Sequence, residues 1–120
     1  MKLVRAGQGD WVEATGYRKK RLLDAEDLDQ PGALVQLVVI PPRTSVGLHH
    51  HERATEVFHI LSGNGRMNIE GQSIELYPGD TVTTQPGDVH DAHNDGDVPF
   101  EYVVFKTNWD PSDSTWQGTK

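Results

Sequence analysis

The chain has 120 residues, a formal net charge of −7, a hydrophobic share of 35% and no cysteine. The acidic balance argues against nucleic acid or an anionic membrane surface as a partner, because like charges repel. Without cysteine, disulfides and thiolate metal sites are excluded, so nitrogen and oxygen must hold any metal.

The first 16 residues are predicted to form an N-terminal arm that packs against the body, with Trp11-Val12 as its sizeable apolar pair. They lack the apolar core of a signal peptide, and no apolar run in the chain approaches membrane length, which favours a cytoplasmic protein. Residues 17–23 alternate weakly and predict a first strand whose basic residues, 18–21, are largely solvated. Residues 24–29 are acidic and suit one helical turn, ended by Pro31-Gly32.

Residues 33–40 predict a strand, because the segment is β-branched and almost continuously apolar. Apolar residues at both odd and even positions indicate burial on both faces. Gln36 is the one polar residue within this run, and Pro41-Pro42 ends it.

The most informative stretch follows at residues 49–56. His49 and His51, at i and i+2 on an extended strand, point the same way, whereas His50 points to the other face and is expected to be exposed. Glu56 opens the next apolar run, and a strand folding back beside the first would bring its carboxylate to the imidazoles. Two imidazoles and a carboxylate suit a divalent transition metal.

The rest of the chain alternates short strands with turns. Asn64-Gly65 predicts a hairpin turn and Gly71-Gln72 another, and residues 100–105 form the last strong strand. Short strands at this spacing, with little helix, predict an all-β sandwich or barrel. We therefore expect one domain over residues 1–120, with the arm at 1–16, a barrel at 17–106 and a polar tail at 107–120.

Two motifs extend the histidine stretch. The first reads His49-x-His51, four residues, Glu56, six residues and Gly63; the second reads Gly79, five residues, Gln85-Pro86-Gly87, two residues, His90, three residues and Asn94. This pattern resembles the two motifs of the cupins, which are small jelly-roll barrels. Arg43 and Gln85 replace a glycine and a proline of the family pattern, and both fall on turn positions and not on ligands.

The resemblance implies an all-β, cupin-type jelly-roll β-barrel, also called a double-stranded β-helix. It implies that His49, His51, Glu56 and His90 bind one divalent transition metal in the mouth of the barrel. Manganese, iron, nickel, zinc and copper all accept such ligands. Open coordination positions would admit water, dioxygen or a chelating substrate.

Other side chains are assigned by strand parity. Gln36, Phe58 and Met67 are candidates for lining the substrate pocket, although core packing explains Phe58 and Met67 equally well. Tyr102 is the candidate catalytic residue, as a proton donor or a substrate anchor. We further expect that His59 lies on the outer face or at a subunit contact, that His93 lies on the surface, and that Asn94 orients a turn.

The function expected from the resemblance is that of a metal-dependent enzyme acting on a small polar chelating molecule. A sugar, sugar acid or carboxylate fits the low aromatic content of 8%, and the reaction would be of isomerase, lyase or decarboxylase type. A metal-dependent dioxygenase and a non-catalytic small-molecule-binding cupin are the alternatives. The family also implies a homodimer, for which Trp11, Trp109 and Trp116 are candidate contacts.

Overall fold

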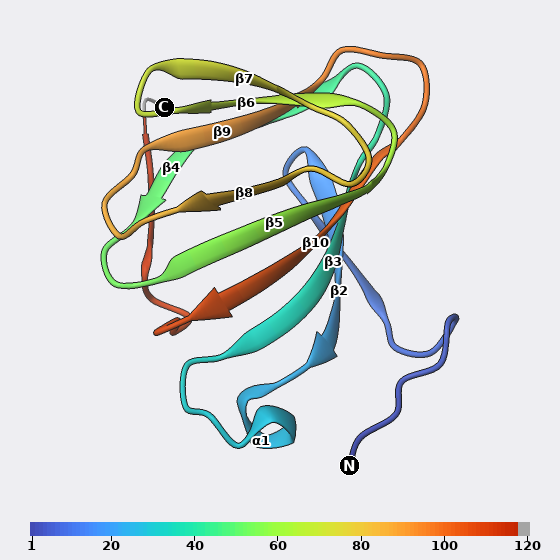
Figure 1. Cartoon of the computed structure of the whole chain (residues 1–120), viewed down its shortest axis with the longest axis vertical. Helices are drawn as coiled ribbons and strands as arrows, with labels where there is room; N and C mark the ends of the chain where they lie inside the picture. The colour runs from blue at the N-terminus through green and yellow to red at the C-terminus, as the bar shows by residue number, and fades with distance from the viewer. Residues whose placement is uncertain (118–120) are drawn as a thin grey trace.

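The computed structural model describes residues 1–117 and consists of two antiparallel β-sheets that face each other (Figure 1). The six-stranded sheet has the order β1 (Trp11–Ala14), β2 (Tyr17–Leu23), β3 (Leu34–Ile40), β10 (Phe100–Thr107), β5 (Thr55–Ser62) and β8 (Thr81–Thr84). The five-stranded sheet has the order β11 (Ser114–Trp116), β4 (Thr44–His51), β9 (His90–Asn94), β6 (Gly65–Ile69) and β7 (Gln72–Leu76). The fold is therefore the predicted all-β double-stranded β-helix.

The hydrophobic core lies between the two sheets, where the inward-facing residues of both meet. Val38 and Val39 are neighbours on β3 and are only 4% and 6% exposed, which confirms that this strand is buried on both faces. The core cluster comprises Val38, Ile40, Val46, Phe58, Ile60, Met67, Leu76, Ala92, Phe100, Tyr102 and Val104.

The chain changes sheet both before and after β5, and two sequence predictions are wrong for this reason. β5 pairs with β10 and β8, so it does not fold back beside β4. The turn after Ser62 leads to β6 in the other sheet, so it is no hairpin. Its positive φ belongs to Gly63 (72°) and not to Gly65, and a Cβ on Gly63 would lie 2.1 Å from the Pro99 carbonyl oxygen.

Two local predictions are close to the observed turns. The hairpin between β6 and β7 turns at Glu70 and Gly71, whose φ values of 50° and 80° suit a tight turn. The predicted helical turn is α1 (Ala25–Leu28). The helix ends at Leu28 and not at residue 29 as expected, because Asp29 adopts the left-handed conformation.

Both terminal segments add strands to sheet edges. β1 forms a hairpin with β2, and Trp11 covers Lys20, whose Nζ lies 5.1 Å from the indole ring. Arg18 is exposed, but Lys20 is 6% exposed, so the prediction that residues 18–21 are largely solvated is wrong for Lys20. Near the other end, β11 pairs with β4; the last three residues of the predicted tail, 118–120, lie outside the described residues. No helix among residues 1–117 has the length and apolarity needed to cross a membrane.

Candidate metal centre

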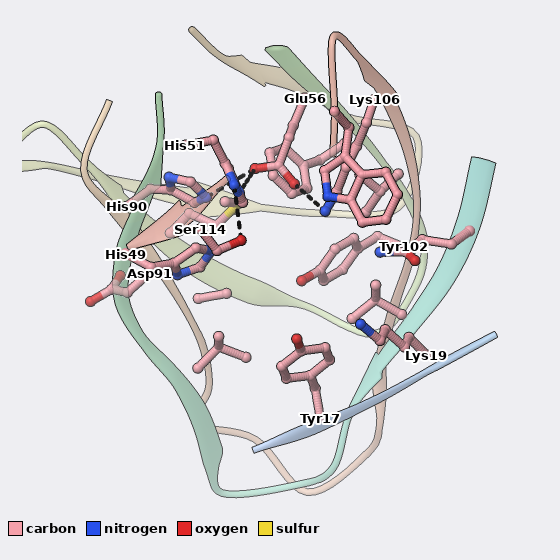
Figure 2. Close-up of a pocket in the computed structure, with 18 of the residues that line it drawn as sticks. Tyr17, Lys19, His49, His51, Glu56, His90, Asp91, Tyr102, Lys106 and Ser114 are labelled. Atoms are coloured by element: carbon pink, nitrogen blue, oxygen red, sulfur yellow. Dashed lines mark hydrogen bonds and ion pairs between the residues drawn. The ribbon is translucent and has the colours of Figure 1, made fainter. Parts of the chain in front are cut away.

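The four predicted ligand residues converge at one end of the space between the sheets (Figure 2). One nitrogen from each of His49, His51 and His90 and one oxygen from Glu56 all lie within 4.8 Å of one another. The histidines come from the five-stranded sheet, where His49 on β4 is paired with His90 on β9. His51 reaches the same point because it follows His49 at i+2 on the strand.

Glu56 arrives from the opposite sheet and not from a strand beside β4. Its Oε1 lies 3.0 Å from His51 Nε2 and 3.1 Å from His90 Nε2. Its Oε2 lies 3.4 Å from Lys106 Nζ on the neighbouring β10. The cluster therefore joins the two sheets. The prediction that Glu56 lies on a strand adjacent to that of His49 and His51 is wrong.

Hydrogen bonds on the far side of each imidazole orient the rings. The Nδ1 atoms of His49 and His90 lie 2.9 Å from the backbone oxygens of Gly47 and Asp88. A carbonyl only accepts, so each Nδ1 carries the proton and each Nε2 keeps its lone pair. His51 Nδ1 lies 3.2 Å from Ser114 Oγ on β11. Such outer partners are typical of metal-binding histidines.

The Nε2 atoms, which face the centre of the cluster, also indicate a metal site. Among residues 1–117, Nε2 of His51 and Nε2 of His90 are buried without a hydrogen bond, although they lie 3.0 and 3.1 Å from Glu56 Oε1. Buried polar atoms without partners are destabilising. A divalent cation at the convergence point would accept both lone pairs. Three imidazole nitrogens and one carboxylate oxygen fit a transition metal.

The electrostatics hold two ligands in the protonation state that a metal requires. Burial lowers the pKa of His49 to about 4, and His90 contributes to this shift. Burial alone would raise the pKa of Glu56, but His51, His90 and Lys106 hold it well below its usual range. For His90, burial lowers the pKa, yet Glu56 outweighs this effect and raises it.

A cavity of about 150 Å³ adjoins the cluster. The three predicted pocket residues line it: Gln36 on β3, Phe58 on β5 and Met67 on β6. The candidate catalytic residue, Tyr102 on β10, lines it as well. Phe58 and Met67 also belong to the core, so these two residues both line the pocket and pack in the core.

Several lining residues were missed by the sequence reasoning. Tyr17, Lys19 and Arg21 on β2 and Lys106 on β10 line the cavity, although the β2 cations were expected to be solvated. Tyr17, Lys19 and Arg21 share one parity, and this alternation was the available clue that one face of β2 turns inward. Residues of the tail line the mouth as well: Trp109, Pro111, Ser114 and Trp116.

The other histidines lie outside the cluster. The prediction that His50 is exposed is wrong: its side chain is 16% exposed, and its Nε2 lies 2.7 Å from Glu52 Oε1. His93 is half-buried and not a plain surface residue, because its Nε2 contacts Asp91 Oδ2 at 2.9 Å. His59 is exposed, beside the Thr81 hydroxyl.

Asn94 orients a turn, as predicted. Its Nδ2 donates to the Ile40 and Val98 oxygens, and its Oδ1 accepts from Gly96 N–H.

The three tryptophans have contacts within the chain. Trp11 packs against Arg18 and Lys20, and Trp109 packs against Arg21 and Lys106. Trp116 lies on the His49 ring with centroids 4.4 Å apart and stays 50% exposed. The homodimer remains a prediction.

Two facing sheets with a three-histidine, one-glutamate cluster at one end define a cupin-type β-barrel with a candidate metal centre. A family model described as the cupin domain matches residues 36–106, and the chain belongs to this family.

Two comparisons with proteins of one organism extend the match beyond the motifs. The chain is 32% identical over 101 residues to an oxalate-binding protein of Thermotoga maritima, covering 84% of this chain and 78% of that protein. A crystal structure from the same organism, described as a predicted oxalate decarboxylase, superposes with a TM-score of 0.82 at 26% identity, covering 88% of this chain and 98% of that one.

A further solved structure has the same fold. The structure of KdgF from Halomonas sp. superposes with a TM-score of 0.80 at 17% identity, covering 92% of this chain and 96% of that one, which shows likeness of fold alone.

Proposed function

We propose that this cupin binds one divalent transition metal through His49, His51, Glu56 and His90 and is an enzyme acting on a small carboxylate that chelates the metal. The observation that carries the proposal is the pair of buried, unpartnered Nε2 atoms of His51 and His90, aimed at the same point as Glu56. The likeness to an oxalate-binding protein supports a carboxylate as the ligand.

The cavity lining favours a carboxylate over an apolar substrate. Gln36, Tyr17 and Tyr102 supply polar groups, and Lys19 and Lys106 supply positive charge. The cavity, at about 150 Å³, lies below the roughly 300–1,000 Å³ of pockets for drug-sized ligands. A dioxygenase for a larger aromatic substrate would call for a wider and more apolar lining.

A bound metal would supply Lewis acidity and positive charge toward the ligand's oxygens. The chain's own groups would hold and orient the ligand. Burial, with a smaller contribution from Glu56, raises the pKa of Tyr102 well above its usual value, so its hydroxyl stays protonated. Tyr102 therefore donates a hydrogen bond as an anchor and is a poor proton donor. Lys106 Nζ, beside Glu56 Oε2, orients the carboxylate that faces the histidines.

Non-catalytic binding is the second candidate function, favoured by the relative that is named for binding oxalate. The two candidates share the site and differ in turnover. Metal-loaded protein incubated with oxalate should release carbon dioxide and formate in equal amounts if the protein is an enzyme of the decarboxylase type. Tight binding without products would assign it to the binding class, and oxygen consumption would indicate a dioxygenase.

The metal site is tested by elemental analysis and by a matched pair of variants. Purified protein should contain, or take up, about one transition metal ion per chain. Glu56→Gln should weaken metal affinity by at least about 100-fold, because loss of even an outer partner costs about 10- to 100-fold. Glu75→Gln, an exposed carboxylate on β7, is the control and should leave affinity unchanged. A protein that neither carries nor takes up metal contradicts the proposal.

A further inference from the structure

The cavity wall that faces the metal cluster carries a second group of polar side chains. Lys19 on β2 is in register with Val38 on β3, and Val38 is in register with Tyr102 on β10. Lys19 and Tyr102 therefore lie in one row and on one face of the six-stranded sheet. Tyr17 precedes Lys19 by two residues and faces the same way, and Figure 2 shows the hydroxyls of Tyr17 and Tyr102 pointing into the cavity.

These groups have no polar partner in the part of the chain that the structure describes. Tyr102 is only 5% exposed, yet none of the described residues makes a hydrogen bond with its hydroxyl. Lys19 makes no ion pair with any of residues 1–117. Glu56, the nearby anion, is already engaged by His51, His90 and Lys106. A hydroxyl without a protein partner that opens into a cavity indicates a ligand group that it would bind.

The charges on this wall favour an anion. Burial lowers the pKa of Lys19, and the nearby cations Lys106 and Arg21 lower it further. Lys106 pairs with Glu56 and Arg21 with Asp24, which leaves Lys19 as the cation of this wall without an ion pair among the described residues. The chain as a whole carries a net charge of −7, so this concentration of positive charge inside the cavity is local. Two hydroxyl donors and an ammonium group match the acceptors of a single carboxylate.

We propose that Tyr17, Lys19 and Tyr102 bind a second carboxylate at the far end of the ligand, so that the preferred ligands are short 2-hydroxy or 2-oxo dicarboxylates. The inference rests on the proposed function, because the metal would hold the near end through the carboxylate and its neighbouring oxygen. The cavity of about 150 Å³ restricts the ligand to a few carbon atoms between the two ends. On this proposal oxalate, whose two carboxylates are directly joined, binds at the metal end alone.

Calorimetric titration of the metal-loaded protein with pairs of acids tests this. Malate and lactate share the 2-hydroxy acid end, as 2-oxoglutarate and 2-oxobutyrate share the 2-oxo acid end, and only the first of each pair has a far carboxylate. Malate should bind about tenfold more tightly than lactate, since charge-assisted hydrogen bonds are the strong ones. Lys19→Met and Tyr102→Phe should each bring the ratio of the two affinities close to one without lowering metal content.

Arg18→Met is the matched control, because Arg18 lies on the outer face of the same strand beside Trp11 and its loss removes the same charge. It should leave the affinity ratio unchanged. Equal affinities for the members of each pair in the unmodified protein, or an unchanged ratio in Lys19→Met, would overturn the inference while the metal and oxalate results stand. Failure to bind metal and every carboxylate would instead refute the proposed function itself.

Discussion

Each imidazole of the cluster has its Nδ1 beside an acceptor, and this decides which nitrogen faces the cavity. His49 and His90 use the backbone oxygen two residues earlier, at Gly47 and Asp88, so their orientation is set locally. His51 instead depends on Ser114, which lies 63 residues away in sequence. The metal-binding geometry of His51 is therefore tied to the docking of β11.

Replacing Ser114 by Ala should weaken metal affinity by about tenfold, because His51 loses its outer partner. Competition with a metal-sensitive dye would measure the change. Ser73→Ala on β7, where the serine is exposed and distant from the cluster, is the control. An affinity equal to that of the unmodified protein would mean that Ser114 has no part in orienting His51.

At the scale of strands and loops, β11 is held in place by the buried carboxylate of Asp113. Asp113 accepts hydrogen bonds from three consecutive backbone N–H groups, those of Glu52, Arg53 and Ala54, at 3.0–3.3 Å. This contact closes the loop between β4 and β5 and places Trp116 over His49. β11, which covers the cavity mouth, is thus anchored to the loop between the predicted ligands His51 and Glu56.

Asp113→Asn should lower the free energy of unfolding by about 2 kcal/mol at pH 7, because hydrogen bonds to a charged acceptor are lost. Burial alone would raise the pKa of Asp113, but the three amides outweigh it and lower the pKa. The stabilisation is therefore present above the unfolded pKa of about 3.9 and is lost as pH falls through the folded value.

Urea titrations at several pH values would show the difference between Asp113→Asn and the unmodified protein shrinking below about pH 4. Asp97→Asn, which removes an exposed ion pair with Arg43, should cost less than about 1 kcal/mol. A deficit of Asp113→Asn that is equal at pH 7 and pH 3 would contradict this account.

Gly63→Ala tests the turn that carries the chain from one sheet to the other. The new Cβ would meet the Pro99 carbonyl, and the positive φ adds strain, so we expect a loss of more than about 2 kcal/mol by thermal or urea unfolding. Gly79→Ala has a similar positive φ but open space around it, and should cost about 1 kcal/mol. Equal losses of stability in the two variants would show that the positive φ causes the loss and that the contact with Pro99 adds nothing to it.

The elements could be predicted from the sequence because strand pattern and turn residues are local. His49 and His51 share a direction by alternation alone, and β3 is recognisable from its β-branched run. Which sheet each strand joins is a long-range property, so the position of Glu56 across the cavity was not predictable. The inward face of β2 was missed because its cations resemble a solvated edge, and β11 is too short and polar to show a strand pattern.

At the scale of the whole molecule, the candidate centre connects the two sheets. His49, His51 and His90 belong to the five-stranded sheet and Glu56 to the six-stranded one. A ligand that binds the folded chain and not the unfolded chain stabilises the fold by mass action. Metal binding here should therefore stabilise the packing of one sheet on the other.

Removing metal with a chelator should lower the melting temperature, and restoring it at 100 times its dissociation constant should return about 2.7 kcal/mol of stability. Scanning calorimetry of the two forms measures this. Glu56→Gln should lose most of the response, and Glu75→Gln should keep it. A melting temperature indifferent to metal in the unmodified protein would contradict a centre that links the sheets.

The absence of cysteine gives this link a further meaning. Residues 49, 51, 56 and 90 are held at one point, which is the kind of long-range tie that a disulfide provides in a secreted domain. A tie made of imidazole and carboxylate is indifferent to thiol reductants, and it responds instead to metal supply and to chelators. The protein's lifetime against proteolysis would then follow the availability of its metal, with resistance gained when metal is plentiful and lost when it is scarce.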